Sequence, residues 1–527
     1  MSFIIKMARD KEEIEQILDL NYETFVEEIP QHNENDKKKL LDRFHSENKY
    51  IICKENSEVI GMMALRDKRP FSLDEKLNSI EEHLNFSFSK PCEVRLLAVK
   101  KNYRNGRVFA SLTGGLIRYC LQKGYDIAFI SGTTRQSKLY RHLGFEPFAH
   151  LVGKDDAMFQ PMFLTKDTFL KNENLQAIAN ISTFLPGPVT IDSEVQDVFR
   201  NQPVWHRSEE HHSVVESVNK KLINMTKAKN VVVLTGSGTL SNDAVAAHLS
   251  GLGSKGLILS NGEFGERLTD HASRFQLEYD HLSYKWGESL DVNQIENKLM
   301  DKKYDWLWFV HCETSTGLLN EFQLIQNLCN KYSIKLCVDA ISSIGAVPIN
   351  FDSIYLATGV SGKAIGSYTG LSFVFFNQLE ETSTQVPRYL DILYYQKSGG
   401  IPFSQNSNLY RALDTALNKF SFHYFEERQS IYLQACDMFN NKGFSFVIDK
   451  QKSSPCVITI NLPKQLSSLE FGEDLYLNGF IVHYRNRYLV EKNWVQIALM
   501  NTKNDIKQLK TLINSMELLL NDQLQLI

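Results

Sequence analysis

A carboxylate and an amine fall in one stretch of the chain, where they could face a single ligand. Asp339 follows the β-branched apolar run 334–338, which is typical of a buried strand. Lys363 lies further along, in a loop rich in Gly, Ser and Thr that is reached through a second apolar segment, 353–357. In open α/β sheets, ligands bind just beyond the carboxyl ends of the strands. Pyridoxal phosphate needs both groups: an amine to bond its aldehyde, and a carboxylate to keep its ring nitrogen protonated.

The spacing alone also suits a simpler interpretation, because most lysines in such loops are solvated and most strand-end aspartates cap a helix. The surrounding letters favour the cofactor. VDAISSIG around Asp339 and SGKAIGSYTG around Lys363 resemble segments of the fold-type-I, class-V aminotransferases, in particular the alanine–glyoxylate and 2-aminoethylphosphonate transaminases. The resemblance covers about residues 182–520. It implies that Lys363 carries the cofactor and shuttles the proton, that Asp339 faces the ring nitrogen, and that Ile341 and Gly362 lie beside the cofactor.

Other segments match the same family in chain order. In VVVLTGSGTLSNDAV, an apolar strand joins a helix through a turn formed by Ser237, Gly238 and Thr239. The unpaired N–H groups of a helix start attract phosphate, although glycines also permit tight turns without a ligand. The resemblance implies that Phe264 stacks on the cofactor ring and that Thr314 contacts the ring oxygen. It also implies that Ser404 reaches the cofactor phosphate of a partner subunit, and thus a homodimer. Phe264 could equally be a core residue.

The residue that binds the substrate's acidic group in this family is replaced here. Relatives use an arginine near the carboxyl end, whose guanidinium makes a two-pronged, charge-assisted bond. The aligned residue in this chain is the neutral Gln496. A buried anion without a partner costs several kcal/mol. Either Arg207, Arg485 or Arg487 takes over this role, or the substrate is not an ordinary α-amino acid.

The first third of the chain has a different pattern. A helical segment, 11–27, precedes strand-like segments at 49–53 and 59–65, and a strand at 93–99 runs into an amphipathic helix. This order resembles the GCN5-related N-acetyltransferases (GNAT) over about residues 3–165. The resemblance implies that Tyr140 protonates the leaving thiolate. It also implies that acetyl-CoA, or another acyl-CoA, binds at Leu97, Val99, Arg104, Gly106, Arg107 and Val108.

The acyl-CoA turn departs from the family's R/Q-x-x-G-x-G/A pattern. Gly106 comes one residue early and Phe109 replaces the last small residue, so the backbone is less open to a phosphate. Arg104 and Arg107 could compensate with charge, and Tyr140 could be a core residue with a satisfied hydroxyl. The front domain is therefore expected either to acylate an amine or to bind acyl-CoA as a sensor.

Composition limits the remaining function classes. The 527 residues carry a formal net charge of −4, with 43% hydrophobic and 23% charged residues, so no basic field points to nucleic acid. No run approaches the ~20 apolar residues that a spanning helix needs, and the first residues do not form a secretory signal. The eight cysteines show neither disulfide nor metal-site spacing. We expect a soluble cytoplasmic enzyme with no metal and no nucleic-acid or membrane partner.

These patterns together predict an α/β protein of two domains. The expected parts are a mixed α/β GNAT domain (1–170), a linker (171–181) and a fold-type-I pyridoxal-phosphate domain (182–527). The last would divide into a large domain with a mostly parallel, seven-stranded type of sheet (about 205–395) and a small α/β subdomain (about 396–527 with 182–204). We expect a bifunctional enzyme: a transaminase that acts on a small amine or amino acid with a 2-oxo acid or aldehyde acceptor, and a GNAT domain that N-acylates an amine. The alternative is a class-V lyase, desulfurase or epimerase with a non-catalytic, acyl-CoA-sensing GNAT domain.

Overall fold

A computed structural model describes residues 3–29, 31–154, 157–301, 303–381, 386–500 and 506–525. The chain divides into two compact units. The front unit comprises Met1–Ser182, Gln465–Ile481 and Thr511–Ile527, and the back unit comprises Thr183–Lys464 and Val482–Lys510. The expected division at 171–181 assigns the last two front-unit segments to the carboxyl-terminal domain, whereas their packing groups them with the amino-terminal one. Within the described ranges, no helix has the length and apolar character needed to cross a bilayer.

The front unit is built on one mixed sheet. Its elements are β1 (Ile4–Met7), α1 (Lys11–Tyr22), η1 (Glu23–Glu28), β2 (Lys49–Glu55), β3 (Glu58–Arg66), α2 (Ser72–Leu77), η2 (Glu81–His83), β4 (Pro91–Val99), η3 (Lys101–Tyr103), α3 (Arg107–Lys123), β5 (Ile127–Thr133), η4 (Thr134–Gln136), α4 (Ser137–His142), β6 (Glu146–Pro147), β7 (Val152–Lys154), β8 (Ala157–Thr165), α5 (Lys166–Lys171), α6 (Glu173–Ile178) and α16 (Ser468–Leu477). The strand order is β1-β2-β3-β4-β5-β8-β6, with β7 paired to β8. Strands β4 and β5 pair in parallel only over Pro91–Val94, although β4 continues to Val99.

Both faces of this sheet are covered, because successive strand residues point to opposite sides. On β2, Ile51 and Cys53 pack in the cluster beneath α3, whereas Tyr50 and Ile52 pack in the cluster beneath α1. The amphipathic pattern that predicts a helix at 107–123 therefore has a core to cover, and a left-handed Gly124 ends that helix.

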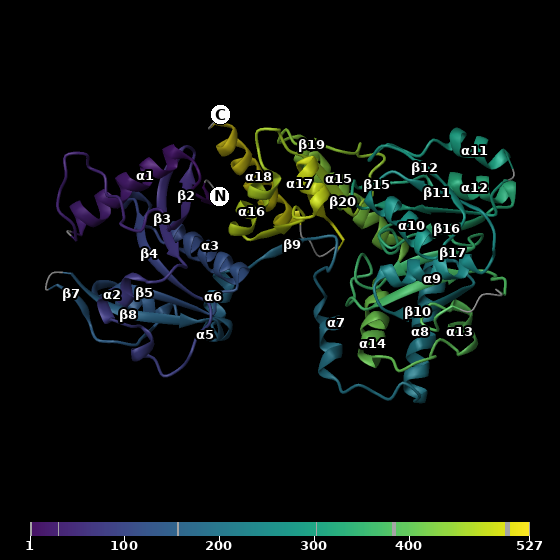
Figure 1. Cartoon of the computed structure of the whole chain (residues 1–527), viewed down its shortest axis with the longest axis horizontal. Helices are drawn as coiled ribbons and strands as arrows, with labels where there is room; N and C mark the ends of the chain where they lie inside the picture. The colour runs from purple at the N-terminus through teal and green to yellow at the C-terminus, as the bar shows by residue number, and fades with distance from the viewer. Residues whose placement is uncertain are drawn as a thin grey trace. The chain divides into compact units, whose positions relative to one another are not determined.

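The carboxyl-terminal segments of the front unit close the edge of its sheet. Asn478, which follows α16, donates from Nδ2 to the carbonyl of Ile5 at 2.7 Å and accepts from the Ile5 N–H at 3.0 Å. One side-chain amide thus replaces a neighbouring strand along β1, whose edge would otherwise expose unpaired groups. Figure 1 shows the yellow helices α16 and α18 beside the purple and blue α3 and β2, despite their separation in sequence.

The back unit is a three-layer α/β fold. Its elements, three of which (β9, β21 and α18) cross a unit boundary, are β9 (Ser182–Phe184), α7 (Ser193–Asp197), η5 (Val198–Arg200), α8 (Glu209–Thr226), β10 (Asn230–Thr235), α9 (Gly238–Ser250), β11 (Gly256–Ser260), α10 (Glu263–Arg274), β12 (Tyr279–Ser283), α11 (Val292–Met300), β13 (Trp306–Val310), β14 (Cys312–Glu313), β15 (Leu318–Leu319), α12 (Phe322–Tyr332), β16 (Lys335–Asp339), β17 (Leu356–Val360), β18 (Leu371–Phe376), α13 (Ile392–Lys397), α14 (Ser407–Ala416), η6 (Leu417–Lys419), α15 (Phe422–Asn440), β19 (Ser445–Phe446), β20 (Val457–Asn461), β21 (Phe480–Val482), α17 (Arg487–Lys492), β22 (Trp494–Ala498) and α18 (Ile506–Gln525).

The central sheet of the back unit confirms the expected seven-stranded, mostly parallel type. Its order is β10-β18-β17-β16-β13-β11-β12, and only the pairs made by β18 are antiparallel. Val231 and Val233 of β10 pack toward α8, α11, α12 and α14, whereas Val232 and Leu234 pack toward α9, α10 and α13. The carboxyl ends of the parallel strands therefore meet along one edge, where a ligand site is expected.

Candidate active sites

The amine and the carboxylate singled out from the sequence lie at that edge. Asp339 ends β16 and pairs with Thr358 of β17, and the loop after β17 carries Lys363. Lys363 Nζ donates to Ser342 Oγ at 2.8 Å, and Ser342 Oγ lies 2.6 Å from Thr314 Oγ1. A chain of hydrogen bonds thus joins Lys363 to Thr314, which the sequence had placed in the same site.

Asp339 is held by donors that fix its position. Its carboxylate accepts from the Ile341 N–H at 3.0 Å and from Asn242 Nδ2 at 2.8 Å. Asn242 Oδ1 in turn accepts from Thr358 Oγ1 at 2.9 Å, and all three polar side chains are buried. A buried carboxylate with satisfied partners keeps one orientation, which is what a partner for a ring nitrogen requires.

The environment of Lys363 favours its neutral, nucleophilic form. Removal of the ammonium from water lowers the pKa of Lys363 below its ordinary value of 10.5, while the Asp339 charge opposes this effect. Lys363 Nζ lies 5.3 Å from the centroid of the Phe264 ring. The expected amine and the expected aromatic face are therefore brought together.

Phe264 is positioned by the start of α10, which a buried carboxylate caps. Glu313 accepts from the Gly265 N–H at 2.9 Å and from the Ser315 N–H at 3.1 Å. Burial raises the pKa of Glu313, and these bonds offset that effect in part. At Gly262 an added Cβ would lie 2.4 Å from Glu313 Cγ, so only glycine lets the carboxylate reach the helix start. The ring of Phe264 is thus set by contacts that join β14 to α10.

The start of α9 offers an anion site at the same strand edge. Ser237 is its N-cap residue and forms no side-chain capping bond, and both Ser237 and Thr239 are exposed. At Gly238 a Cβ would lie 2.6 Å from Ile341 Cδ1, so the turn packs directly against the residue that precedes Ser342. Helix N–H groups of this kind bind phosphate.

At Gly362, a Cβ would lie 2.5 Å from Thr369 Cγ2, so the backbone beside Lys363 packs too closely against Thr369 to accept a larger residue. Amine, carboxylate, aromatic face and phosphate cradle together fit pyridoxal phosphate.

The residues expected to bind the substrate are a buried glutamine, Gln496, and three exposed arginines. Gln496 is fully buried: its Nε2 donates to the carbonyls of Thr314 and Ser315 at 2.7 and 3.0 Å, and its Oε1 lies 2.8 Å from His483 Nδ1. The Gln496 amide is therefore committed to the protein and positions the Thr314 backbone.

The three candidate arginines are all exposed. Arg487 pairs with Glu491, with 91% of its side chain accessible, and Arg485 donates to Tyr484 Oη at 3.0 Å. Arg207 donates to the carbonyl of Ile401 at 3.4 Å. Ser404 lies exposed before α14, and its reach to a partner subunit stays a prediction.

Several residues of this site were missed from sequence. Ser342 stands inside the VDAISSIG motif and links Lys363 to Thr314, a role that the motif alone does not reveal. Asn242 and Glu313 act through contacts with distant segments. Asn242 stands between Ser241 and Asp243, so no local signal distinguishes it from its polar neighbours.

In the front unit, the residues expected at acyl-CoA surround the start of α3. Gly106 is the N-cap in a left-handed conformation (φ +86°), and Leu97 and Val99 lie on β4 beyond its pairing with β5. Val108 is buried against Gly61, whereas Arg107 is exposed, and its N–H donates to Asn105 Oδ1 at 3.1 Å. Gly106 thus begins α3, and one N–H group of this turn is already bonded.

Arg104 and Tyr140 already have partners within the front unit. Arg104 donates to the Val99 carbonyl at 2.8 Å and pairs with Glu28 at 2.8 Å, so its charge is largely used by the protein. The half-buried Tyr140 packs its ring over Gly132, where a Cβ would approach to 2.8 Å. Burial raises the pKa of Tyr140, which keeps its hydroxyl protonated as a general acid requires.

Each of the two units contains a segment that matches a known family. Residues 196–386 match the class-V aminotransferases, and residues 20–114 match the GNAT acetyltransferase domain. Over 321 residues the chain is 26% identical to the bifunctional phosphonoacetaldehyde hydrolase/aminoethylphosphonate transaminase of Clostridioides difficile, covering 56% of this chain and 50% of that protein. It is equally similar, at 26%, to the 2-aminoethylphosphonate–pyruvate transaminase of Phocaeicola vulgatus, covering 56% of this chain and 88% of that protein.

Solved structures show the same fold for the back unit. The alanine–glyoxylate aminotransferase of Nostoc sp. superposes with a TM-score of 0.61 at 24% identity, covering 65% of this chain and 95% of the other. The ureidoglycine–glyoxylate aminotransferase of Bacillus subtilis gives 0.60 at 20% identity, covering 64% and 92%.

Proposed function

We propose that the chain is a bifunctional enzyme, because residues 196–386 match the class-V aminotransferases and residues 20–114 match the GNAT acetyltransferase domain. Its back unit is a pyridoxal-phosphate-dependent aminotransferase that moves an amino group from a small amine or amino acid to a 2-oxo acid or aldehyde. The observation that carries this is the arrangement of Lys363 Nζ over the Phe264 ring, beside the buried Asp339. The bound cofactor would supply an electron-accepting ring.

The chain's own residues would divide the work as follows. Lys363 holds the cofactor's aldehyde and, once released, moves the proton through its Nζ atom, for which a lowered pKa is suited. Asp339 keeps the proton on the ring nitrogen, and Asn242 holds Asp339 in place. Ser342 and Thr314 orient the amine and the ring oxygen through their shared hydrogen bond. Ser237, Gly238 and Thr239 receive the phosphate, and we propose that Ser404 of a second subunit completes that site.

The donor we propose does not rely on an arginine at position 496. The Gln496 amide is occupied by backbone carbonyls and by His483, so it has no free donor for a substrate carboxylate. A primary amine with no acidic group makes no demand for such a clamp, whereas the phosphonate of 2-aminoethylphosphonate, which names one of the relatives, would still need a cationic partner. An amino acid would need one of the exposed arginines to move in.

A single-turnover experiment tests this function. Purified protein supplied with pyridoxal phosphate is mixed with each of a panel of amines and without an oxo acid, and the oxo product is counted. A transaminase stops after about one product per site, because the amino group stays on the enzyme, and resumes when pyruvate or glyoxylate is added. Lys363→Ala should abolish the product, and the surface variant Lys229→Ala should not. Continuous turnover without acceptor would refute transamination in favour of a lyase or desulfurase.

For the front unit we propose N-acylation of an amine with acetyl-CoA. Three observations support this: β4 continues beyond its pairing with β5, α3 begins at Gly106, and burial keeps the Tyr140 hydroxyl protonated. Release of the CoA thiol in the presence of the amine substrates measures the activity. Tyr140→Phe should lower it, whereas Tyr389→Phe, at an exposed position, should leave it unchanged. Binding of acetyl-CoA with no thiol release would favour the sensor.

We also propose a homodimer in the cytoplasm. All eight cysteines are free, and seven of them are buried, which suits a reducing compartment. Sedimentation of the purified protein tests the dimer directly. If the protein is a monomer while fully active, Ser404 has no role across subunits.

A further inference from the structure

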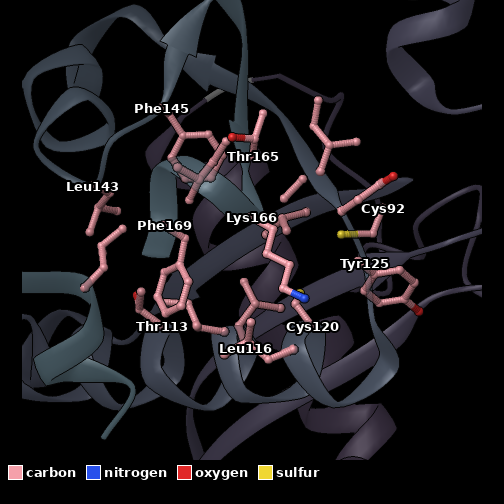
Figure 2. Close-up of a pocket in the computed structure, with 18 residues that line it drawn as sticks. Cys92, Thr113, Leu116, Cys120, Tyr125, Leu143, Phe145, Thr165, Lys166 and Phe169 are labelled. Atoms are coloured by element: carbon pink, nitrogen blue, oxygen red, sulfur yellow. The ribbon is translucent and has the colours of Figure 1, made fainter. Parts of the chain in front are cut away.

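The front unit contains a pocket apart from the acyl-CoA turn. It lies between the carboxyl-terminal half of α3, the first residues of β4 and β5, the end of β8, and α5, and Figure 2 shows its lining. Its volume is about 90 Å³, and neither the turn from Arg104 to Val108 nor Tyr140 lines it. The pocket is therefore a separate feature of the fold.

The walls are almost entirely hydrocarbon. They are formed mainly by Leu116, Ile117, Leu121, Leu143, Phe145 and Phe169. Apolar cavities of roughly this size accept small hydrocarbon groups, and each buried CH₂ contributes about 0.8 kcal/mol. The pocket therefore favours an apolar group, because its walls provide few hydrogen-bonding partners for a polar one.

One lining residue of the pocket has a polar atom without a partner. Thr113 is only 7% exposed, and its Oγ1 forms no hydrogen bond within the part of the chain that the structure describes. Figure 2 shows Thr113 beside Phe169, away from Lys166. A buried hydroxyl without a partner is costly. The unpaired hydroxyl therefore makes this wall less stable than a fully apolar one would be.

The opening carries a positive charge. Lys166, the first residue of α5, is exposed, and Figure 2 shows its side chain crossing the pocket with the nitrogen near Cys120. Among the described residues no carboxylate forms an ion pair with it. The nearby Asp126 is committed, since it accepts from Ser89 Oγ at 2.7 Å and from the Lys90 N–H at 3.0 Å. A single ammonium is left at the mouth of an apolar hollow.

We propose that this pocket binds a monocarboxylate with a medium-length hydrocarbon chain. The carboxylate pairs with the Lys166 ammonium, and the chain lies against Leu116, Leu143 and Phe169. One cation without a second charge or a guanidinium fork suits a monoanion better than a phosphate. The competing explanation is that the Lys166 stem merely covers an apolar groove while its charge stays in water.

Titration calorimetry of the full-length protein with octanoate tests the proposal, with 1-octanol as the uncharged analogue. Lys166→Gln should weaken octanoate binding by about two- to fivefold, the value of an exposed ion pair, and leave octanol binding unchanged. Lys171→Gln, an exposed lysine on the same helix, is the matched control and should change neither. Cys120→Phe, at a half-buried position of α3, should weaken both ligands by filling the opening, with the fold checked by circular dichroism.

Three results would overturn the proposal. The first is the absence of octanoate binding to the wild-type protein at millimolar concentration. The second is equal affinity in the Lys166→Gln and Lys171→Gln variants, which would make the lysine a mere cover. The third is displacement of octanoate by acetyl-CoA, which would place the ligand in the acyl-CoA site.

Discussion

Asn242 of α9 should control catalysis without touching the substrate. Its Nδ2 donates to Asp339 Oδ2 at 2.8 Å, and both side chains are buried. Loss of a hydrogen bond to a buried charged group costs about 1.5–3 kcal/mol, and about 1.4 kcal/mol is tenfold in rate. Asn242→Ala should therefore lower kcat by about 10- to 100-fold. Asn242 contacts Asp339 and not the amine substrate. The KM for the amine should therefore change little.

The matched control is Thr358→Val. It removes only the bond from Thr358 Oγ1 to Asn242 Oδ1, at 2.9 Å, and leaves the donor to Asp339 in place. Its kcat should fall less than tenfold, since a neutral hydrogen bond contributes about 1 kcal/mol. Steady-state kinetics at saturating pyridoxal phosphate, with melting temperatures alongside, separates the two variants. A positioning role would be refuted if Asn242→Ala kept the wild-type kcat. It would also be refuted if both variants lost kcat equally and in proportion to the fall in their melting temperatures.

Three further predictions follow from the same structure. Gln496→Leu should lower thermal stability and kcat together, because it leaves the Thr314 and Ser315 carbonyls without their donor; a rise in donor KM at unchanged melting temperature would show instead that Gln496 binds substrate. Gly262→Ala should destabilise the back unit by about 1–3 kcal/mol, measured by tryptophan fluorescence during urea unfolding, since its Cβ would meet Glu313; an unchanged midpoint would contradict the close contact. Burial raises the pKa of Glu13, but the charge and hydrogen bond of Lys6 outweigh it and lower that pKa from 4.5 to about 2, so the stability that ionised Glu13 contributes is present above pH 4.5 and is lost as the pH falls toward 2. Hydrogen exchange of β1 and α1 should show that loss, and Glu13→Gln should flatten it.

The sequence could predict the cofactor site because its reactive residues lie in short, continuous motifs. Asp339 and Lys363 end or follow adjacent strands, so the strand order alone brings them to one edge. The residues that hold them could not be predicted in the same way. Asn242 reaches Asp339 only after α9 packs against β17 and β18, and the Glu313 contacts depend on where β14 meets α10.

Gln496 illustrates both sides of this limit. The absence of an arginine was readable from the residue type, since a neutral amide cannot replace a guanidinium. The actual contacts of Gln496 depend on the pairing of β22 with β20, which sets Gln496 opposite Thr459 and within reach of the Thr314 carbonyl. A single position can therefore reveal a difference in residue type but not the structural consequence of that difference.

The front unit includes a segment from the carboxyl-terminal end of the chain, and no local sequence pattern predicts this. Lys6 of β1 and Lys54 of β2 are buried, and each pairs with both Glu13 of α1 and Asp522 of α18, so two positive and two negative charges balance in the interior. A buried charge without its partner costs about 3–5 kcal/mol. Cutting the chain at the expected linker would remove Asp522 and leave two lysines facing one glutamate. We therefore expect a fragment that ends at residues 171–181 to be destabilised, because Asp522 near the far end of the chain neutralises part of its interior charge.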